Sequence, residues 1–175
     1  RSLSLADIAT KADLPLQEVQ ALFPSRNKIL KSLMQRVDAE MMSASFDEDD
    51  PVRDRLFELV MRRFDTLAPY RDGIAAIARE TVRDPAAALC SGPAVMCAMR
   101  RTLDTAGVGT RGLIGLLRVK AMTALYLDSL RIWLQDDSED AARTMAALDK
   151  RLRMAERAEQ FCRPPRRRPV EAEAA

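Results

Sequence analysis

The side chains that most often carry enzyme chemistry are scarce in this sequence. The chain of 175 residues contains no histidine, which removes the commonest acid–base group and the commonest metal ligand. Its three cysteines, Cys90, Cys97 and Cys162, occur without the CxxC spacing of metal and redox sites, and we interpret them as reduced thiols. No nucleophile–base pair or glycine-rich phosphate loop is visible either. The sequence therefore predicts a protein that is not an enzyme and that uses no metal and no cofactor.

Two acidic runs, at residues 47–50 and 136–140, are the remaining candidates for metal ligands. Both stand between segments with helical periodicity, where acidic side chains favour the positive end of the following helix. We interpret both runs as solvated linkers and helix caps.

The composition favours a helical protein without a strong overall charge. Hydrophobic residues make up 47% of the chain, charged residues 31%, and glycines and aromatics are few. The formal net charge of +2 is too small to attract nucleic acid globally, so any such binding must be local. No apolar run is long enough to span a bilayer, and no signal-type segment is visible. Together with the cysteine content, this predicts a cytoplasmic protein.

Apolar residues recur at intervals of three and four along most of the chain, and nowhere do they alternate as in a strand. The fold class is therefore all-α. Helices are predicted over 4–12, 15–22, 24–41, 51–67, 69–82, 85–103 with a break or kink at 91–93, 111–135 and 138–161. The predicted domains are a head at 1–45, a helical body at 46–162 and a disordered tail at 163–175.

The segment 111–135 is apolar on two faces. One stripe includes Leu113, Leu117 and Ala124, and the other includes Met122, Tyr126 and Trp133, so the helix must be covered from two sides. With the last helix, it could form half of a four-helix interface in a homodimer. The predicted interface residues are Leu113, Leu117, Ala124, Met145, Leu148 and Leu152. The alternative is that both helices are buried within one subunit.

Several methionines and aromatics of the body could line a pocket for a small apolar effector or a lipid, because such side chains adapt to apolar guests. They are Phe57, Met61, Phe64, Met96, Met99, Tyr126 and Trp133. Ordinary core packing is the alternative for each.

The run "SLADIATKADLPLQEVQALFPSRNKIL", residues 4–30, has the spacing of two short helices joined by a tight turn and followed by a third. It resembles the DNA-binding head of TetR-type transcriptional repressors. The matching positions are Ser4, Ile8, Ala9, Ala12, Leu14, Phe23, Ser25, Arg26 and Ile29. The resemblance implies a head that reads an operator as a dimer and a body whose small-molecule ligand releases the DNA. The first helix of such a head is absent here, which indicates a truncated N-terminus.

The exposed side chains of this run depart from the family pattern. Asp13 stands where the family has glycine in the turn, and Gln17, Glu18, Gln20 and Leu22 replace other common residues of the recognition helix. Residues 1–42 contain six Lys or Arg against five Asp or Glu, which is little positive charge for a surface that neutralises phosphates. The predicted DNA-binding residues are Ser4 and Arg26 for phosphate, Gln17 and Gln20 for base edges, and Pro15 and Leu16 on the same surface.

A second resemblance covers residues 131–161, whose sequence is similar to the C-terminal signature of TetR-fold ubiquinone-biosynthesis accessory proteins. The matching residues are Trp133, Asp136, Asp137, Ser138, Thr144, Leu148, Asp149, Arg151 and Leu152. This resemblance implies an isoprenoid-lipid pocket, a vestigial head and contact with a membrane surface. The alternative for its acidic residues is helix capping. The tail "RPPRRRP" could bind anionic lipid or nucleic acid, or be only solvated.

Two functional hypotheses follow. The order of helices over the whole chain favours a dimeric TetR-type regulator whose DNA binding is modulated by a small apolar ligand. The altered recognition helix and the C-terminal signature favour a lipid- or prenyl-quinone-binding accessory protein. We take the first as the prediction and keep the second as the alternative.

Overall fold

The computed structural model describes residues 4–47, 49–83 and 85–162, with the side chains of 26–27, 80–83, 85–91 and 159–162 left out. In the part of the chain that it describes, every secondary-structure element is a helix, which confirms the all-α prediction. They are α1 (Leu5–Ala12), α2 (Leu16–Leu22), α3 (Arg26–Met42), α4 (Val52–Leu67), the short 3₁₀ helix η1 (Ala68–Tyr70), α5 (Arg71–Arg83), α6 (Pro85–Thr105), α7 (Gly112–Trp133) and α8 (Ala142–Cys162). The predicted disordered tail, 163–175, lies outside the described residues.

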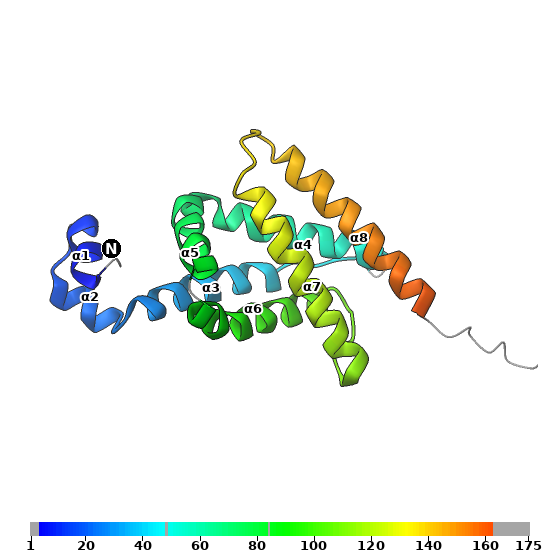
Figure 1. Ribbon diagram of the computed structural model, residues 1–175, viewed down its shortest axis with the longest axis horizontal. Helices are drawn as coiled ribbons and strands as arrows, with labels where there is room; N and C mark the ends of the chain where they lie inside the picture. Colours follow the sequence, from blue (N-terminus) through cyan, green and yellow to red (C-terminus); the bar gives the residue numbers. More distant parts are fainter. Residues whose placement is uncertain (1–3, 48, 84, 163–175) are drawn as a thin grey trace, which may run out of the picture.

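The helices form two parts of unequal size (Figure 1). α1 and α2 pack against each other at one end of the molecule, and α3 runs from them into the body, where α4, α6, α7 and α8 pack together. The C-terminal half of α3 already belongs to the body core through Val37 and Met41, which are 0% and 4% exposed. The boundary between head and body at residues 45–46 remains a prediction.

Phe64 of α4 lies at the centre of the core. Its ring stacks on Tyr126 at 5.7 Å and on Trp133 at 5.3 Å between ring centroids. Leu59 and Leu148 are fully buried in the same cluster, so α4, α7 and α8 are held together by one continuous apolar interior.

Most helix bounds lie within two residues of the sequence prediction, and two features differ more clearly. α6 continues through Pro93, so a break at 91–93 is excluded, and the kink given as the alternative stays a prediction. A proline removes one hydrogen bond from a helix, and the contacts of α6 with α5 and α7 outweigh that loss. α8 begins at Ala142 rather than at Ser138, because the side chains of Ser138 and Asp140 accept hydrogen bonds from the Ala142 N–H at 3.0 and 3.2 Å and so precede the first turn.

Candidate functional site

The first helix of the head begins with a capping box. The Asp7 N–H donates to Ser4 Oγ at 3.1 Å, and the Ser4 N–H donates to Asp7 Oδ2 at 2.8 Å. The hydrogen bonds from Ser4 lower the pKa of the Asp7 carboxyl. The predicted start of this helix is confirmed. Since the Ser4 hydroxyl already serves as the cap, its contact with a phosphate remains a prediction.

The turn between α1 and α2 accommodates an aspartate where the resembling family has glycine. Asp13 adopts the left-handed conformation, with φ of 54° and ψ of 43°, and the Leu14 N–H donates to the carbonyl of Ala9 at 3.0 Å. Asp enters this region more readily than most residues because its short side chain is polar. The departure at Asp13 therefore leaves the helix-turn-helix geometry in place.

α2 presents the predicted base-reading residues to solvent. Val19 is 5% exposed and lies on the buried side of the helix, whereas Gln17 and Gln20 are exposed to solvent. These two glutamines are three residues apart and therefore neighbours on one face. Pro15 is the N-cap residue of α2, and Leu16 in its first turn is 38% exposed. The structure thus brings four of the six predicted DNA-binding residues together on one short helix and its N-cap.

The other two predicted DNA-binding residues lie on neighbouring elements. Ser4 caps α1, and Arg26 is the first residue of α3, with its side chain outside the described part of the chain. Glu18 is exposed on α2 beside Gln17 and places a negative charge on this surface.

The predicted pocket residues divide into a buried group and a half-buried group. Phe64, Met99, Tyr126 and Trp133 are at most 6% exposed and belong to the hydrophobic core. Their burial agrees with ordinary core packing, the alternative to a pocket. Phe57, Met61 and Met96 are half-buried at the border of this core. The pocket assignment remains a prediction for these three.

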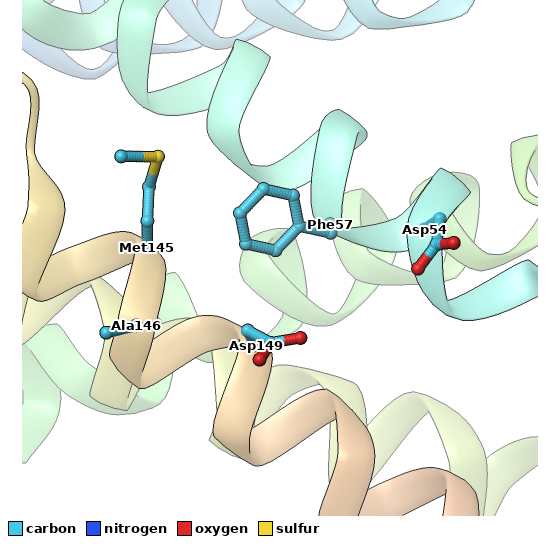
Figure 2. Close-up of a pocket in the computed structure, with 5 residues that line it drawn as sticks. All are labelled: Asp54, Phe57, Met145, Ala146 and Asp149. Carbon is cyan, nitrogen blue, oxygen red and sulfur yellow. The ribbon is translucent and has the colours of Figure 1, made fainter.

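Phe57 also lines an open groove of about 340 Å³ between α4 and α8. Figure 2 shows its ring directed from α4 toward Met145 of α8, with Asp54 and Asp149 at the border. The groove has an apolar centre, and each carboxylate at its border is already paired with an arginine at 2.8 Å, Asp54 with Arg53 and Asp149 with Arg153. The apolar centre therefore suits an apolar guest. Met145, predicted for the dimer interface, is part of this groove.

The residues predicted for the dimer interface also divide into an exposed group and a buried group. Leu113 and Leu117 are 87% and 67% exposed on the outer face of α7, and Ala124 is exposed beside them. Leu148 and Leu152 are only 0% and 3% exposed, because they face α4 and α7 within the same chain. These two residues belong to the core, and we remove them from the predicted interface.

The C-terminal signature forms the corner that joins α7 to α8. Asp136 is 2% exposed; its Oδ2 accepts from the Thr144 N–H and Oγ1 at 2.7 Å, and its Oδ1 accepts from Ser138 Oγ at 2.5 Å. The hydrogen bonds from Ser138, together with those from Thr144, hold the pKa of Asp136 far below its usual range although burial opposes this. Arg71 closes the corner by donating to the carbonyls of Trp133 and Asp136 at 2.8 and 2.6 Å. Helix capping thus accounts for Asp136, Ser138 and Thr144.

An ionic cluster that the sequence analysis missed connects α3 to the body. Asp38 of α3 accepts from Arg63 of α4 and from Arg101 of α6, each at 2.7 Å. Arg63 is 2% exposed and lies over the Tyr126 ring at 5.6 Å. Its place among Leu59, Val60 and Leu67 in the apolar stripe of α4 was a signal that this arginine would be buried. The helix that leads to the head is therefore tied to two helices of the body.

Neither a protein-family model nor a curated protein sequence matches this chain. Among solved structures, the chain is similar to the TetR transcriptional regulator from Nitrosomonas europaea ATCC 19718. The TM-score is 0.72, the sequence identity 22%, and the match covers 89% of this chain and 87% of that chain. The chain therefore has a TetR-like fold, with a helix-turn-helix head and a helical body.

The part of the chain that the structure describes holds neither a metal site nor a membrane-spanning helix. It contains no group of three or more Cys, Asp or Glu side chains placed to hold a metal ion. Nor is any helix within it long and apolar enough to cross a membrane.

Proposed function

We propose that this chain is a TetR-type transcriptional regulator, which binds DNA as a homodimer and whose DNA binding is modulated by a small apolar ligand. The observation that carries the proposal is the exposed pair Gln17 and Gln20 on the second helix of an intact helix-turn-helix, at the end of a TetR-like fold. No enzymatic step is part of this function.

On DNA, α2 is the recognition helix. A glutamine amide can donate to N7 and accept from N6 of adenine in the major groove, so Gln17 and Gln20 favour sites with adenine at two positions. Arg26 and Ser4 flank this helix and contact phosphates, while Pro15 and Leu16 form its leading edge. Because Glu18 repels the backbone, we expect modest affinity. The phosphate contacts of the basic residues make that affinity fall as the salt concentration rises.

A second copy covers the outer face of α7. Leu113, Leu117 and Ala124 are exposed along this face, on the side of the helix opposite the buried Met122 and Tyr126. A two-fold axis at this face would bury the same apolar patch twice and place two heads on one DNA molecule.

The groove between α4 and α8 is the proposed effector site. A ligand against Phe57 would press on α4, which also carries Arg63. Arg63 holds Asp38 of α3, so movement of α4 would reach the helix that positions the head. The groove and the head are thus connected through α4, the Arg63–Asp38 ion pair and α3.

The decisive experiment is selection of DNA fragments by the full-length protein, followed by fluorescence anisotropy with the selected sites. We expect a near-palindromic site whose affinity falls steeply between about 50 and 200 mM salt. Equal affinity for selected and random DNA would contradict the proposal.

The dimer is tested by Leu117→Glu, with Met42→Glu as control, because Met42 is similarly exposed at 65% on a different helix. Sedimentation velocity should find dimers for the wild type and the control and monomers for Leu117→Glu. Dimers of Leu117→Glu would place the interface elsewhere.

The alternative is a lipid- or prenyl-quinone-binding accessory protein with a vestigial head, and the exposed Glu18 on α2 favours it. Mass spectrometry of the native protein would then find a co-purified isoprenoid lipid, and DNA selection would return no preferred sequence. The two hypotheses therefore predict opposite results in the same pair of measurements.

A further inference from the structure

Helix α2 presents two side chains directly away from the rest of the head. α2 packs against α1 at one end of the molecule (Figure 1), and Val19, 5% exposed, marks its inner side. Successive residues of an α-helix are about 100° apart, so the positions two residues before and after a buried one lie almost opposite it. For Val19 these positions are Gln17 and Ala21, and both are exposed. They define the outermost line of α2.

The other exposed residues of α2 lie away from this line. Leu16 and Leu22 are 38% and 69% exposed, but each is three residues from the buried position and therefore only about 60° from it around the helix. Glu18 and Gln20 are direct neighbours of the buried position and lie on the two flanks of the helix. Ala21 is therefore the apolar side chain on the outermost line.

A methyl group at this place is suited to one feature of the major groove. Of the four bases of DNA, thymine alone presents a methyl group there, and alanine makes apolar contact with it. Because the side chain of Ala21 is a single carbon, it also lets the helix approach the base edges closely.

We propose that Ala21 is a specificity-determining residue, which contacts the C5 methyl group of a thymine in each half-site. The inference rests on the proposed function, in which α2 reads DNA. Gln17 and Ala21 are four residues apart, about 6 Å along the helix, which is close to two base-pair steps of about 3.4 Å each. With α2 aligned along the groove, each half-site carries an adenine for Gln17 and, two base pairs away, a thymine for Ala21.

The first test removes the methyl group from the DNA and leaves the protein unchanged. In the site that the full-length protein selects, each thymine is replaced in turn by uracil, which pairs identically but lacks the C5 methyl group. We expect one thymine in each half-site, two base pairs from an adenine, at which this change weakens binding about fourfold, as for the loss of one buried carbon. Fluorescence anisotropy at constant salt concentration measures the affinities.

A variant assigns this loss to the side chain. Ala21→Gly removes the methyl group of the protein, so the same replacement of thymine by uracil should leave its affinity unaltered. The matched control is Ala6→Gly, which removes a methyl group from an exposed position of α1 at a similar cost in helix propensity and should keep the loss of about fourfold. Circular dichroism melts establish that both variants remain folded.

Two results would overturn the inference: a selected site in which no thymine two base pairs from an adenine is sensitive to loss of its methyl group, or a loss that persists in full in Ala21→Gly. Either result leaves the regulator function standing, because the protein has then still selected a specific DNA sequence. Failure to select any sequence would contradict the proposed function and the inference together.

Discussion

The head and the body of this protein reach their structures by different physical routes. In the head, Ala9 and Val19 are the buried apolar residues of α1 and α2, and the helices are otherwise specified by local features, the capping box at Ser4 and the left-handed turn at Asp13. In the body, α4, α7 and α8 depend on contacts between residues far apart in sequence, such as Phe64 with Trp133. A locally specified helix-turn-helix can keep its shape while its exposed residues change, whereas the body cannot change its central residues without repacking.

The two regions meet at Asp38. This carboxylate lies on the helix that leads to the head, yet both of its ion-pair partners, Arg63 and Arg101, belong to the body. Breaking a partly buried pair of this kind is costly because it leaves a charge without a partner. The comparison therefore predicts large effects for changes in the body and small, local ones for changes in the head.

The largest effect is expected for Phe64→Ala. Because Phe64 is 0% exposed and stacks on two aromatic rings, its loss should lower the free energy of unfolding by about 3–5 kcal/mol in urea titrations. Phe57→Ala is the matched control on the same helix, half-buried beside the groove, and should cost clearly less. Equal losses would mean that the groove side of α4 is packed as tightly as the core.

Asp136→Ala comes next, with an expected loss of about 3 kcal/mol, because the Thr144 N–H and hydroxyl would remain buried without their acceptor. Asp137→Ala is the control: its side chain is fully exposed, and the change should stay within about 0.5 kcal/mol in the same denaturation experiment. A loss in Asp137→Ala as large as that in Asp136→Ala would contradict the capping role.

The same corner predicts a pH dependence. The folded state holds the pKa of Asp136 below its ordinary value, so below about pH 4 the unfolded chain binds a proton that the folded chain does not. The stability contributed by this carboxylate is present above that pH and is lost as the pH falls toward the folded-state pKa. Denaturation of the wild type and of Asp136→Asn from pH 6 to pH 2 should therefore show a stability difference that shrinks on acidification. A constant difference would exclude a lowered pKa.

In the head, Gln17→Ala and Gln20→Ala should each weaken binding to the selected DNA by about 1–3 kcal/mol. The slope of affinity against salt should not change, because glutamine neutralises no phosphate. Gln35→Ala, at an exposed position of α3, is the control for fluorescence anisotropy. If Gln17→Ala and Gln20→Ala bind the selected DNA as tightly as the wild type and the control do, α2 is not the recognition helix.

The smallest effect is expected for Ser4→Ala, which removes the cap of α1 and should cost about 1 kcal/mol. Hydrogen exchange should become faster in α1 and stay unchanged in α7, because the head is held by local contacts. Ser45→Ala, an exposed serine outside any helix, is the control. Faster exchange in α7 as well would show that head and body unfold as one unit.

Much of the fold could be predicted from short-range patterns. The spacing of residues such as Ile8, Ala9 and Leu14 predicted the helix-turn-helix. The two stripes of 111–135 separated the buried Met122 and Tyr126 from the exposed Leu113 and Leu117. The candidate sites were less predictable. Methionine and aromatic residues identify both pockets and cores, so the same pattern placed Phe57 and Phe64 in one set, although one lines a groove and the other is fully buried.

The sequence by itself determined the helices, their caps and the side of each helix that must be covered, because these follow from backbone hydrogen bonding and a period of 3.6 residues. Only the tertiary structure decided which neighbour covers each side. It placed Leu148 and Leu152 against the body instead of a second copy, and it buried Arg63 opposite Asp38. Such choices depend on packing between segments distant in sequence, which no local period specifies.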